Sequence, residues 1–233
     1  MLNPVQAQEL PFAHYTVDSD VNPLPSSSVS EVYQDKLGYL WFVVYSSGLV
    51  RYDGHNMVVY TTDHGLSSNT SIGITEDKLG RLWVPSRKGL SVSTKPLSNY
   101  AASESVKFTT EIGGQKLTQL GISSDTVVLD NKGNIWAGTA EGLFKYEYVG
   151  ENVVKETQIK TALDNAGQSI MVTAVKARSN GEVWAGLADG RVVILNSDKA
   201  GWNPVKPRLD SNKCARVTSL YEHPNGALYG GCD

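Results

Sequence analysis

Short runs in which apolar and polar positions alternate recur along this chain, and a tight turn follows each of them. Alternation of this kind is typical of β-strands that bury one face. Each turn leads into a second strand that carries a bulky aromatic residue. The runs lie at 29–33, 72–75, 127–129, 172–175 and 217–221. The sequence therefore predicts a series of antiparallel hairpins.

The turn and the aromatic residue after it form a repeated sequence. The copies read DKLGYLW, DKLGRLW, DNKGNIW, RSNGEVW and, more weakly, HPNGALY. They end at Trp41, Trp83, Trp136, Trp184 and Tyr229, so they recur at intervals of 42, 53, 48 and 45 residues. Repetition at this period is typical of β-propellers, in which each repeat is a blade of four antiparallel strands. The predicted fold class is all-β, a β-propeller.

The predicted propeller occupies 11–233, with about four complete blades and a partial fifth. The blades are expected at 28–62, 70–112, 124–162 and 170–212, and the partial blade at 214–233. Four and a half blades do not close a ring, which leaves two explanations open. The chain is a piece of a longer ring, or two chains complete one another. We favour the first, because an unpaired edge strand promotes aggregation.

Each of the repeated turns holds a glycine. A short hairpin loop built on a type I turn needs one residue at positive φ, which glycine adopts without a Cβ clash. Asp35, Asp77 and Asp130 begin three of the turns and are expected to accept backbone N–H bonds, so we interpret them as turn-forming groups and not as catalysts. The five glycines are Gly38, Gly80, Gly133, Gly181 and Gly226.

The tryptophans at equivalent positions are expected to pack between blades, since one indole buries about 150–250 Å². An exposed platform for stacking sugar rings is the alternative. The spacing after Trp41 is unusual: Gly48 follows it by seven positions, whereas the equivalent step in the next three copies is six. This extra residue predicts a bulge or a protruding turn from Tyr45 to Ser47.

The beginning of the chain resembles an outer strand without the rest of its blade. Residues 11–16 are similar to 57–61, and 24–28 are similar to 66–69, so an outer-strand segment is predicted ahead of the first blade. Residues 1–10 are interpreted as a signal-peptide remnant or a disordered N-terminus, because Val5 and Ala7 occupy the small-residue positions of a cleavage site.

Composition narrows the function classes. The formal net charge is −3, so no basic field is available to hold nucleic acid. No apolar run approaches the roughly 20 residues that cross a bilayer, and we expect no membrane contact by this segment. His14, His55, His64 and His223 fall at different structural positions, so neither a metal site nor a cofactor is expected.

Two cysteines flank the last predicted hairpin. Pairing Glu222 with Ala227 places Val217 opposite Cys232, which leaves Cys214 three residues out of register unless a bulge intervenes. A disulfide needs Cα atoms within about 7 Å. The sequence leaves open whether Cys214 and Cys232 form a disulfide.

The complete repeat resembles the two-component regulator propeller repeat. The shared string is a leucine, a polar pair, Asn or Ser, an apolar strand, Glu/Gln-Asp-x-x-Gly-x-Leu-Trp, a spacer, Gly-Leu and x-x-Tyr-Asp-Gly. The match is close over 24–54 and 66–90, good over 127–146 and looser over 172–195 and 217–233.

This resemblance implies the periplasmic sensor region of a bacterial membrane receptor. Such regions contain seven-bladed propellers and are followed by a small β-domain, a transmembrane helix and a histidine kinase or diguanylate cyclase. The resemblance implies that this segment senses a signal and is not itself an enzyme, and it admits a homodimer formed through the receptor. A propeller enzyme, either a lyase or a glycoside hydrolase, and a protein-interaction scaffold remain as alternatives.

In a propeller, the loops between the second and third strands share one face with the loops between blades. Mixed donors and acceptors with one aromatic ring suit a small polar ligand, of which oligosaccharides are one candidate class. The alternative is that these side chains are solvated turn tips. The face is expected to collect Tyr45, Ser46, Arg87, Lys88, Glu141 and Asp189, and the inter-blade loops add Asn22, His64, Asn69 and Gln168.

Overall fold

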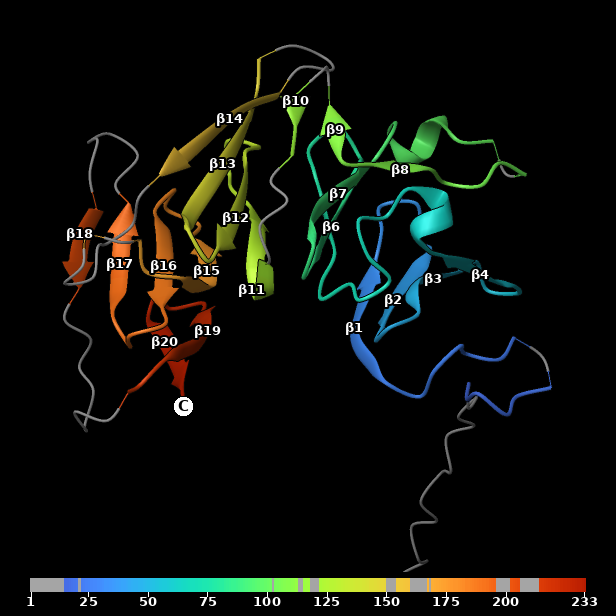
Figure 1. Ribbon diagram of the computed structural model, residues 1–233, viewed down its shortest axis with the longest axis horizontal. Coiled ribbons are helices and arrows are strands. Elements are labelled where there is room, and N and C mark those ends of the chain that lie inside the picture. Colours follow the sequence, from blue (N-terminus) through green and yellow to red (C-terminus); the bar gives the residue numbers. More distant parts are fainter. Residues whose placement is uncertain are drawn as a thin grey trace, which may run out of the picture.

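Successive antiparallel sheets form an open arc in the computed structural model (Figure 1). The structure describes residues 15–20, 22–101, 103–112, 115–117, 122–149, 154–159, 167, 169–195, 202–205 and 214–233, without the side chains of 115–116, 122–125 and 202–205. In every four-stranded sheet the strands are ordered as they occur in the sequence. This up-and-down order is that of a propeller blade, and the predicted fold class is confirmed.

Four sheets of four strands are followed by one hairpin. Blade 1 consists of β1 (Val29–Gln34), β2 (Leu40–Val44), β3 (Gly48–Tyr52) and β4 (Met57–Tyr60). Blade 2 consists of β5 (Thr75–Glu76), β6 (Leu82–Ser86), β7 (Gly89–Ser93) and β8 (Phe108–Thr109). Blade 3 consists of β11 (Ile122–Leu129), β12 (Ile135–Thr139), β13 (Gly142–Tyr148) and β14 (Val154–Ile159). Blade 4 consists of β15 (Val172–Ala177), β16 (Val183–Leu187), β17 (Val192–Leu195) and β18 (Trp202–Val205), and the partial blade 5 of β19 (Val217–Glu222) and β20 (Leu228–Cys232).

The remaining elements are small and connect the blades. The hairpin of β9 (Glu111–Ile112) and β10 (Gln115–Lys116) lies between blades 2 and 3. Helical structure in the described ranges is confined to two 3-10 turns, η1 (Thr62–His64) and η2 (Leu97–Asn99). The first strands of neighbouring blades contact one another, β5 with β11, β11 with β15, and β15 with β19. The first strands therefore follow the inner side of the arc.

The apolar core is divided among the interfaces between blades. Trp41 of blade 1 is buried in one cluster with Leu82 and Val84 of blade 2. Trp83 of blade 2 is buried with Ile135 of blade 3, and the next two interfaces repeat the arrangement with Trp136 and Trp184. Each tryptophan thus packs against the following blade. Tyr229, at the same repeat position in blade 5, is 58% exposed.

A repeated hydrogen bond fixes each buried indole to its own turn. Trp41 Nε1 donates to Asp35 Oδ2 at 2.7 Å, and the indoles of Trp83 and Trp136 donate to Asp77 and Asp130 at 2.8 Å each. The other oxygen of each Asp accepts two backbone N–H bonds of the turn. The turn glycines have φ between 81° and 94°, as this turn requires.

Blade 4 makes the same bond with a different residue. Arg178 stands where the first three copies have Asp, and Trp184 Nε1 donates instead to Glu182 Oε2 at 3.0 Å. Arg178 pairs with Glu182 at 2.9 Å and with Glu222 of blade 5 at 3.1 Å. The looser repeat thus exchanges an aspartate for an ion-pair network that also crosses to the next blade.

Carboxylates at the ends of first strands join neighbouring blades. Glu76 accepts the backbone N–H of Lys36 at 3.1 Å and the Tyr33 hydroxyl at 3.4 Å, both from blade 1. Burial, followed by the Glu76 carboxylate, raises the pKa of Tyr33 to about 12. Tyr148 of blade 3 donates to Asp77 of blade 2, and burial together with this carboxylate raises the pKa of Tyr148 above its usual range.

The segment before blade 1 runs along that blade. Leu24 is buried against Val44 and Val50, and the hydroxyl groups of Tyr15 and Tyr52 lie 2.8 Å apart. Residues 11–14 of the predicted outer-strand segment and residues 1–10 lie outside the described residues.

Cys214 and Cys232 form a disulfide, with Cα atoms 5.4 Å apart. Val217 does pair with Cys232, and the register shifts between Val217 and Ser219. The chain before β19 continues along the end of β20, where Asp233 N donates to Arg216 O at 3.1 Å. This continuation brings Cys214 to Cys232 despite the offset in sequence.

Candidate functional site

The turns between second and third strands lie at the same end of blades 1 to 4, because the strand order is the same in each blade. We call this end the turn face. All six side chains expected there are exposed: Tyr45, Ser46, Arg87, Lys88, Glu141 and Asp189. Each turn belongs to its own blade, and within the described part of the chain no hydrogen bond or ion pair links one turn to the next.

The turns of blades 2 and 3 are built alike from different sequences. Ser86 Oγ and Thr139 Oγ1 each donate to the carbonyl of the following glycine, Gly89 or Gly142, at 3.1 Å. The same hydroxyl oxygens accept the backbone N–H two residues on, at 3.0 and 3.1 Å. These bonds fix the backbone, so the side chains of the two residues at each tip are not needed to hold the turn.

Blade 1 has the predicted protruding turn. Val44 pairs with Gly48, and three residues form its loop, whereas Ser86 pairs with Gly89 across a loop of two. Ser46 has φ of 59°, an uncommon value for a residue other than glycine. Tyr45 is 51% exposed, so its ring is available to a ligand.

Inter-blade loops flank this turn. Gly48 N donates to Asn69 O at 2.8 Å, and Tyr45 N donates to Ser28 O at 2.9 Å. The structure therefore brings Asn69 to the turn face as expected. His64 caps η1, where its Nδ1 accepts from Thr61 N at 3.2 Å.

The expectation for Asn22 is wrong. Its side chain donates to His55 O, in the turn between β3 and β4, and accepts from Met57 N, at the start of β4, at 3.2 Å. That turn lies at the opposite end of the blade, because β3 runs away from the turn face. The segment before blade 1 crosses the face of that sheet on which Leu24 contacts Val44 and Val50, and the similarity between residues 24–28 and 66–69 did not reveal this path. Gln168 lies outside the described residues.

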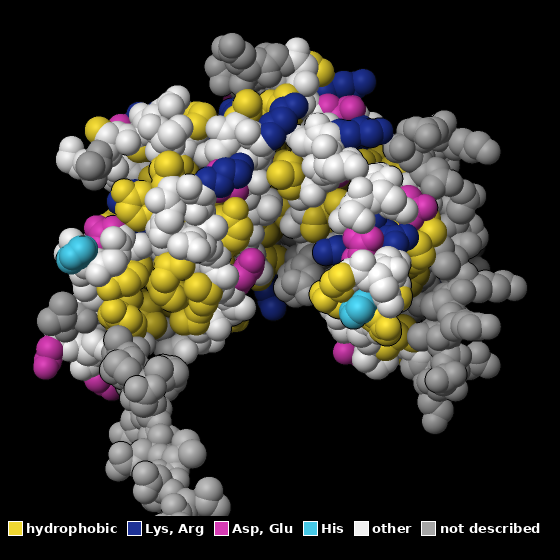
Figure 2. Space-filling model, turned by 180° about the vertical axis from the view of Figure 1, so that it is seen from behind, with side chains coloured by type: hydrophobic (Ala, Val, Ile, Leu, Met, Phe, Trp, Pro, Cys, Tyr) yellow, Lys and Arg dark blue, Asp and Glu magenta, His cyan; other side chains and the backbone are white. Residues whose placement is uncertain are grey.

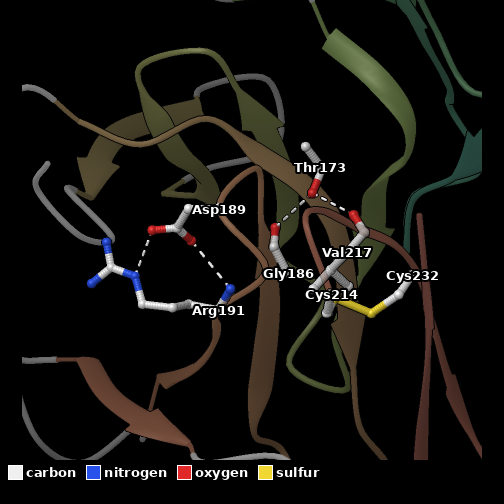
Figure 3. Close-up of a disulfide and its surroundings, with 7 residues drawn as sticks. All are labelled: Thr173, Gly186, Asp189, Arg191, Cys214, Val217 and Cys232. Carbon is white, nitrogen blue, oxygen red and sulfur yellow. Dashed lines mark hydrogen bonds and ion pairs between the residues drawn. A yellow bond between two sulfur atoms is a disulfide. The ribbon is translucent and has the colours of Figure 1, made fainter. Parts of the chain in front are cut away.

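Asp189 has a partner that sequence reasoning did not place in the site. Arg191 Nε lies 2.6 Å from Asp189 Oδ2, and Arg191 N donates to Asp189 Oδ1 at 3.1 Å, so the pair closes the blade 4 turn (Figure 3). A signal was present, because Arg191 replaces the leucine of the repeated Gly-Leu pair. The disulfide lies beside this turn, and a Cβ atom on Gly190 would meet Cys214 O at 2.1 Å.

The described residues contain no group of three or more His, Cys, Asp or Glu side chains that could hold a metal ion. In the same part of the chain, no helix has the length and apolar character needed to cross a membrane.

Comparison with known proteins supports the fold. PorZ, described as an essential bacterial surface component of the type IX secretion system of Porphyromonas gingivalis, matches over 94% of this chain and 33% of its own, with 14% identity and a TM-score of 0.64. A gluconolactonase from Xanthomonas campestris matches over 89% and 70%, with 10% identity and a TM-score of 0.57. At these identities the similarity shows the propeller fold alone.

A further match is the extracellular domain of a protein assigned as a hybrid two-component system from B. thetaiotaomicron, with 16% identity, 92% of this chain and 33% of that chain covered, and a TM-score of 0.49. The chain spans about a third of the length of this extracellular domain and of the PorZ chain. No family model matches the chain, and no curated protein matches it.

Proposed function

We propose that this chain is the ligand-sensing propeller of a bacterial signal-transduction receptor and binds a small polar ligand, an oligosaccharide among the candidates, on its turn face. One observation carries the proposal. The bonds that hold the framework repeat from blade to blade, whereas the exposed residues at the turn tips differ in every blade. A rigid scaffold with variable loops on one side suits recognition.

The sensor class rests on the sequence repeat, which resembles that of two-component regulator propellers. In such a receptor the output would be a histidine kinase or a diguanylate cyclase, and the propeller itself would be non-catalytic. A periplasmic location agrees with the disulfide, since disulfides persist in oxidising compartments outside the cytoplasm.

The proposed ligand contacts come from four successive turns. Tyr45 offers an aromatic ring, Arg87 and Lys88 offer cationic donors, and Glu141 offers an acceptor. Asp189 is already paired with Arg191 and would act with it as a hydrogen-bonding unit. An aromatic ring beside mixed donors and acceptors is the composition that fits a sugar with apolar ring faces and polar edges.

The test is a binding screen of oligosaccharides and polar metabolites by calorimetry, with the purified chain and with the intact receptor. Arg87→Ala combined with Lys88→Ala is expected to weaken binding at least tenfold. Lys132→Ala serves as the control, because Lys132 is exposed and lies in the β11–β12 turn of blade 3, at the opposite end from the turn face. Unchanged affinity and signalling in the double variant would reject the turn face.

The alternative enzyme class is tested with the same protein. The similarity to a gluconolactonase concerns the fold and assigns no activity to this chain. Incubating the purified propeller with lactones and glycosides is expected to give no product. Turnover that is abolished by a substitution on the turn face would replace the sensor proposal with a catalytic one.

A further inference from the structure

A second candidate binding site lies at the opposite end of the blades from the turn face. A cavity of about 160 Å³ opens where blade 1 meets blade 2. Its residues come from the β1–β2 turn, the end of β3 and the segment between β7 and β8, all at the end opposite the turn face. It is lined by Leu37, Tyr39, Arg51, Leu97, Ser98, Tyr100 and Ala101.

Arg51 is the charged residue of this cavity, and every other lining residue is neutral. Its guanidinium carbon lies 4.9 Å from the centre of the Tyr39 ring and 5.9 Å from that of Tyr60. The Nε atom is buried and has no hydrogen-bond partner among the described residues. Buried donors are nearly always paired, because an unpaired one costs free energy.

Comparison within the described part of the chain shows that Arg51 lacks the carboxylate partner that its counterpart in blade 3 has. Lys145 of blade 3 occupies the equivalent position, since it pairs with Trp136 as Arg51 pairs with Trp41. Lys145 has a carboxylate partner, Glu147, at 2.6 Å. The residue two positions after Arg51 is Asp53, whose Oδ1 accepts the N–H groups of His55 and Asn56 in the next turn, and no ion pair joins it to Arg51 among the described residues.

Two other shielded arginines, Arg81 and Arg178, also have carboxylate partners. Arg81 lies 3.4 Å from Asp77, and Arg178 pairs with two glutamates. Within the described part of the chain, Arg51 has no such ion pair. The Arg51 guanidinium is partly removed from water, lies against aromatic rings and has no carboxylate partner among the residues that the structure describes. Such a group can bind a carboxylate that a ligand supplies.

The other residues that line the cavity indicate the size and polarity of the molecule that it can hold. The β1–β2 turn holds Tyr39 in place, because Tyr39 N donates to Asp35 Oδ1 at 3.0 Å. The Tyr100 hydroxyl is likewise fixed, at 2.8 Å from Thr94 Oγ1 and 3.0 Å from Lys107 O, so that its ring forms a wall. Leu37 and Leu97 add apolar surface. A cavity of about 160 Å³ limits the occupant to a small molecule.

We propose that this cavity binds a small carboxylate with an apolar body, through a charge-assisted bond between its carboxylate and Arg51. The apolar body would lie against Tyr39, Leu97 and Tyr100. Guanidinium groups favour planar carboxylates, with which they form paired hydrogen bonds. The site is separate from the turn face, so its existence does not depend on the proposed sensing function.

The experiment measures benzoate and butyrate binding to the purified chain by ligand-observed NMR and calorimetry, at constant ionic strength. Benzamide is the matched neutral probe and inorganic phosphate the anion without an apolar body. Benzoate is expected to bind at least tenfold more tightly than either. This comparison needs no variant, so it decides the proposal even if a substitution disturbs folding.

Two variants locate the site. Arg51→Met keeps the length and apolar stem of the side chain and is expected to weaken benzoate binding at least tenfold. Lys132→Met removes one positive charge from the equivalent blade 3 turn, away from the cavity, and is expected to leave affinity within twofold.

Three results would overturn the proposal. They are the absence of benzoate and butyrate binding, equal affinity for benzoate and benzamide, and tighter binding of phosphate. Equal losses in Arg51→Met and Lys132→Met would show a general charge effect and would also reject the cavity. Failure of the oligosaccharide screen on the turn face would leave this result untouched.

Discussion

At the scale of single residues, the bond between an indole and a turn carboxylate explains why the first three copies of the repeat share both the Asp and the Trp. The Asp holds the turn through one oxygen and orients the Trp through the other. The indole N–H would otherwise be a buried donor without a partner, because Trp41 and Trp83 are fully buried. The sequence indicated a turn role for the Asp, but the link to the Trp depends on side-chain direction, which a spacing does not report.

Replacing a buried tryptophan tests how much one such residue contributes. Trp83→Ala or Trp136→Ala is expected to lower the free energy of unfolding by about 3–5 kcal/mol, since the ring fills the interface between two blades. That is a large share of a typical total of about 5–15 kcal/mol. Chemical denaturation followed by circular dichroism gives the measurement.

Tyr229→Ala is the matched control, because Tyr229 holds the same repeat position but is mostly exposed. It is expected to change the free energy of unfolding by less than about 0.5 kcal/mol. Equal losses in the Trp136 and Tyr229 variants would contradict the burial argument.

At the scale of elements, the pattern of alternation and turns was sufficient to predict hairpins and four-stranded sheets. The longer spacer after Trp41 predicted the protruding turn. The paired strands keep the same length, so an extra residue can be accommodated only in the loop. The path of residues 22–28 could not be predicted, since sequence similarity to 66–69 says nothing about which side of a sheet a segment crosses. The partner of Asp189 was missed because Arg191 lies outside the turn tip.

Two turn glycines allow the cost of an unfavourable backbone conformation to be distinguished from the cost of a steric clash. Gly38 and Gly48 both have positive φ, 94° and 85°. A Cβ on Gly38 would have no atom within 4 Å, whereas one on Gly48 would meet Tyr60 O at 2.1 Å. Gly38→Ala is therefore expected to cost about 1–2 kcal/mol, the strain of a left-handed alanine.

Gly48→Ala is expected to cost more than Gly38→Ala, because the inter-blade connection after β4 must also move away. Thermal unfolding of the two variants beside the parent measures the difference. Similar melting temperatures for the two would show that the connection at Tyr60 yields easily, and that the close approach is not a constraint on the blade 1 turn.

At the scale of the whole molecule, the arc has well-packed middle blades and less covered ends. The strands β6, β7 and β12 are buried at every position, whereas β1 alternates between half-buried and exposed and β20 is mostly exposed. Apolar side chains gather on the outer blades at both arms of the arc (Figure 2), and the exposed ones include Val32, Val59 and Tyr221.

This gradient predicts how the molecule opens. In repeat architectures each unit is stabilised by its neighbours, so the end units open first. Amide hydrogen exchange is expected to be slowest in β6, β7 and β12 and faster in β1 and β20. The disulfide should slow exchange in blade 5 and bring it closer to that of the middle blades, because closing a loop of 18 residues contributes about 3 kcal/mol to stability.

Reduction of the Cys214–Cys232 disulfide isolates this contribution. Exchange is expected to accelerate in β19 and β20, and to a smaller degree in β15, whose Thr173 hydroxyl bonds Val217 O at 2.5 Å (Figure 3). Blades 1 and 2 should exchange as before, because they share no interface with blade 5 in the arc. A uniform acceleration across all blades would mean that the chain opens as one cooperative unit, and that the disulfide stabilises the whole arc and not its last blade.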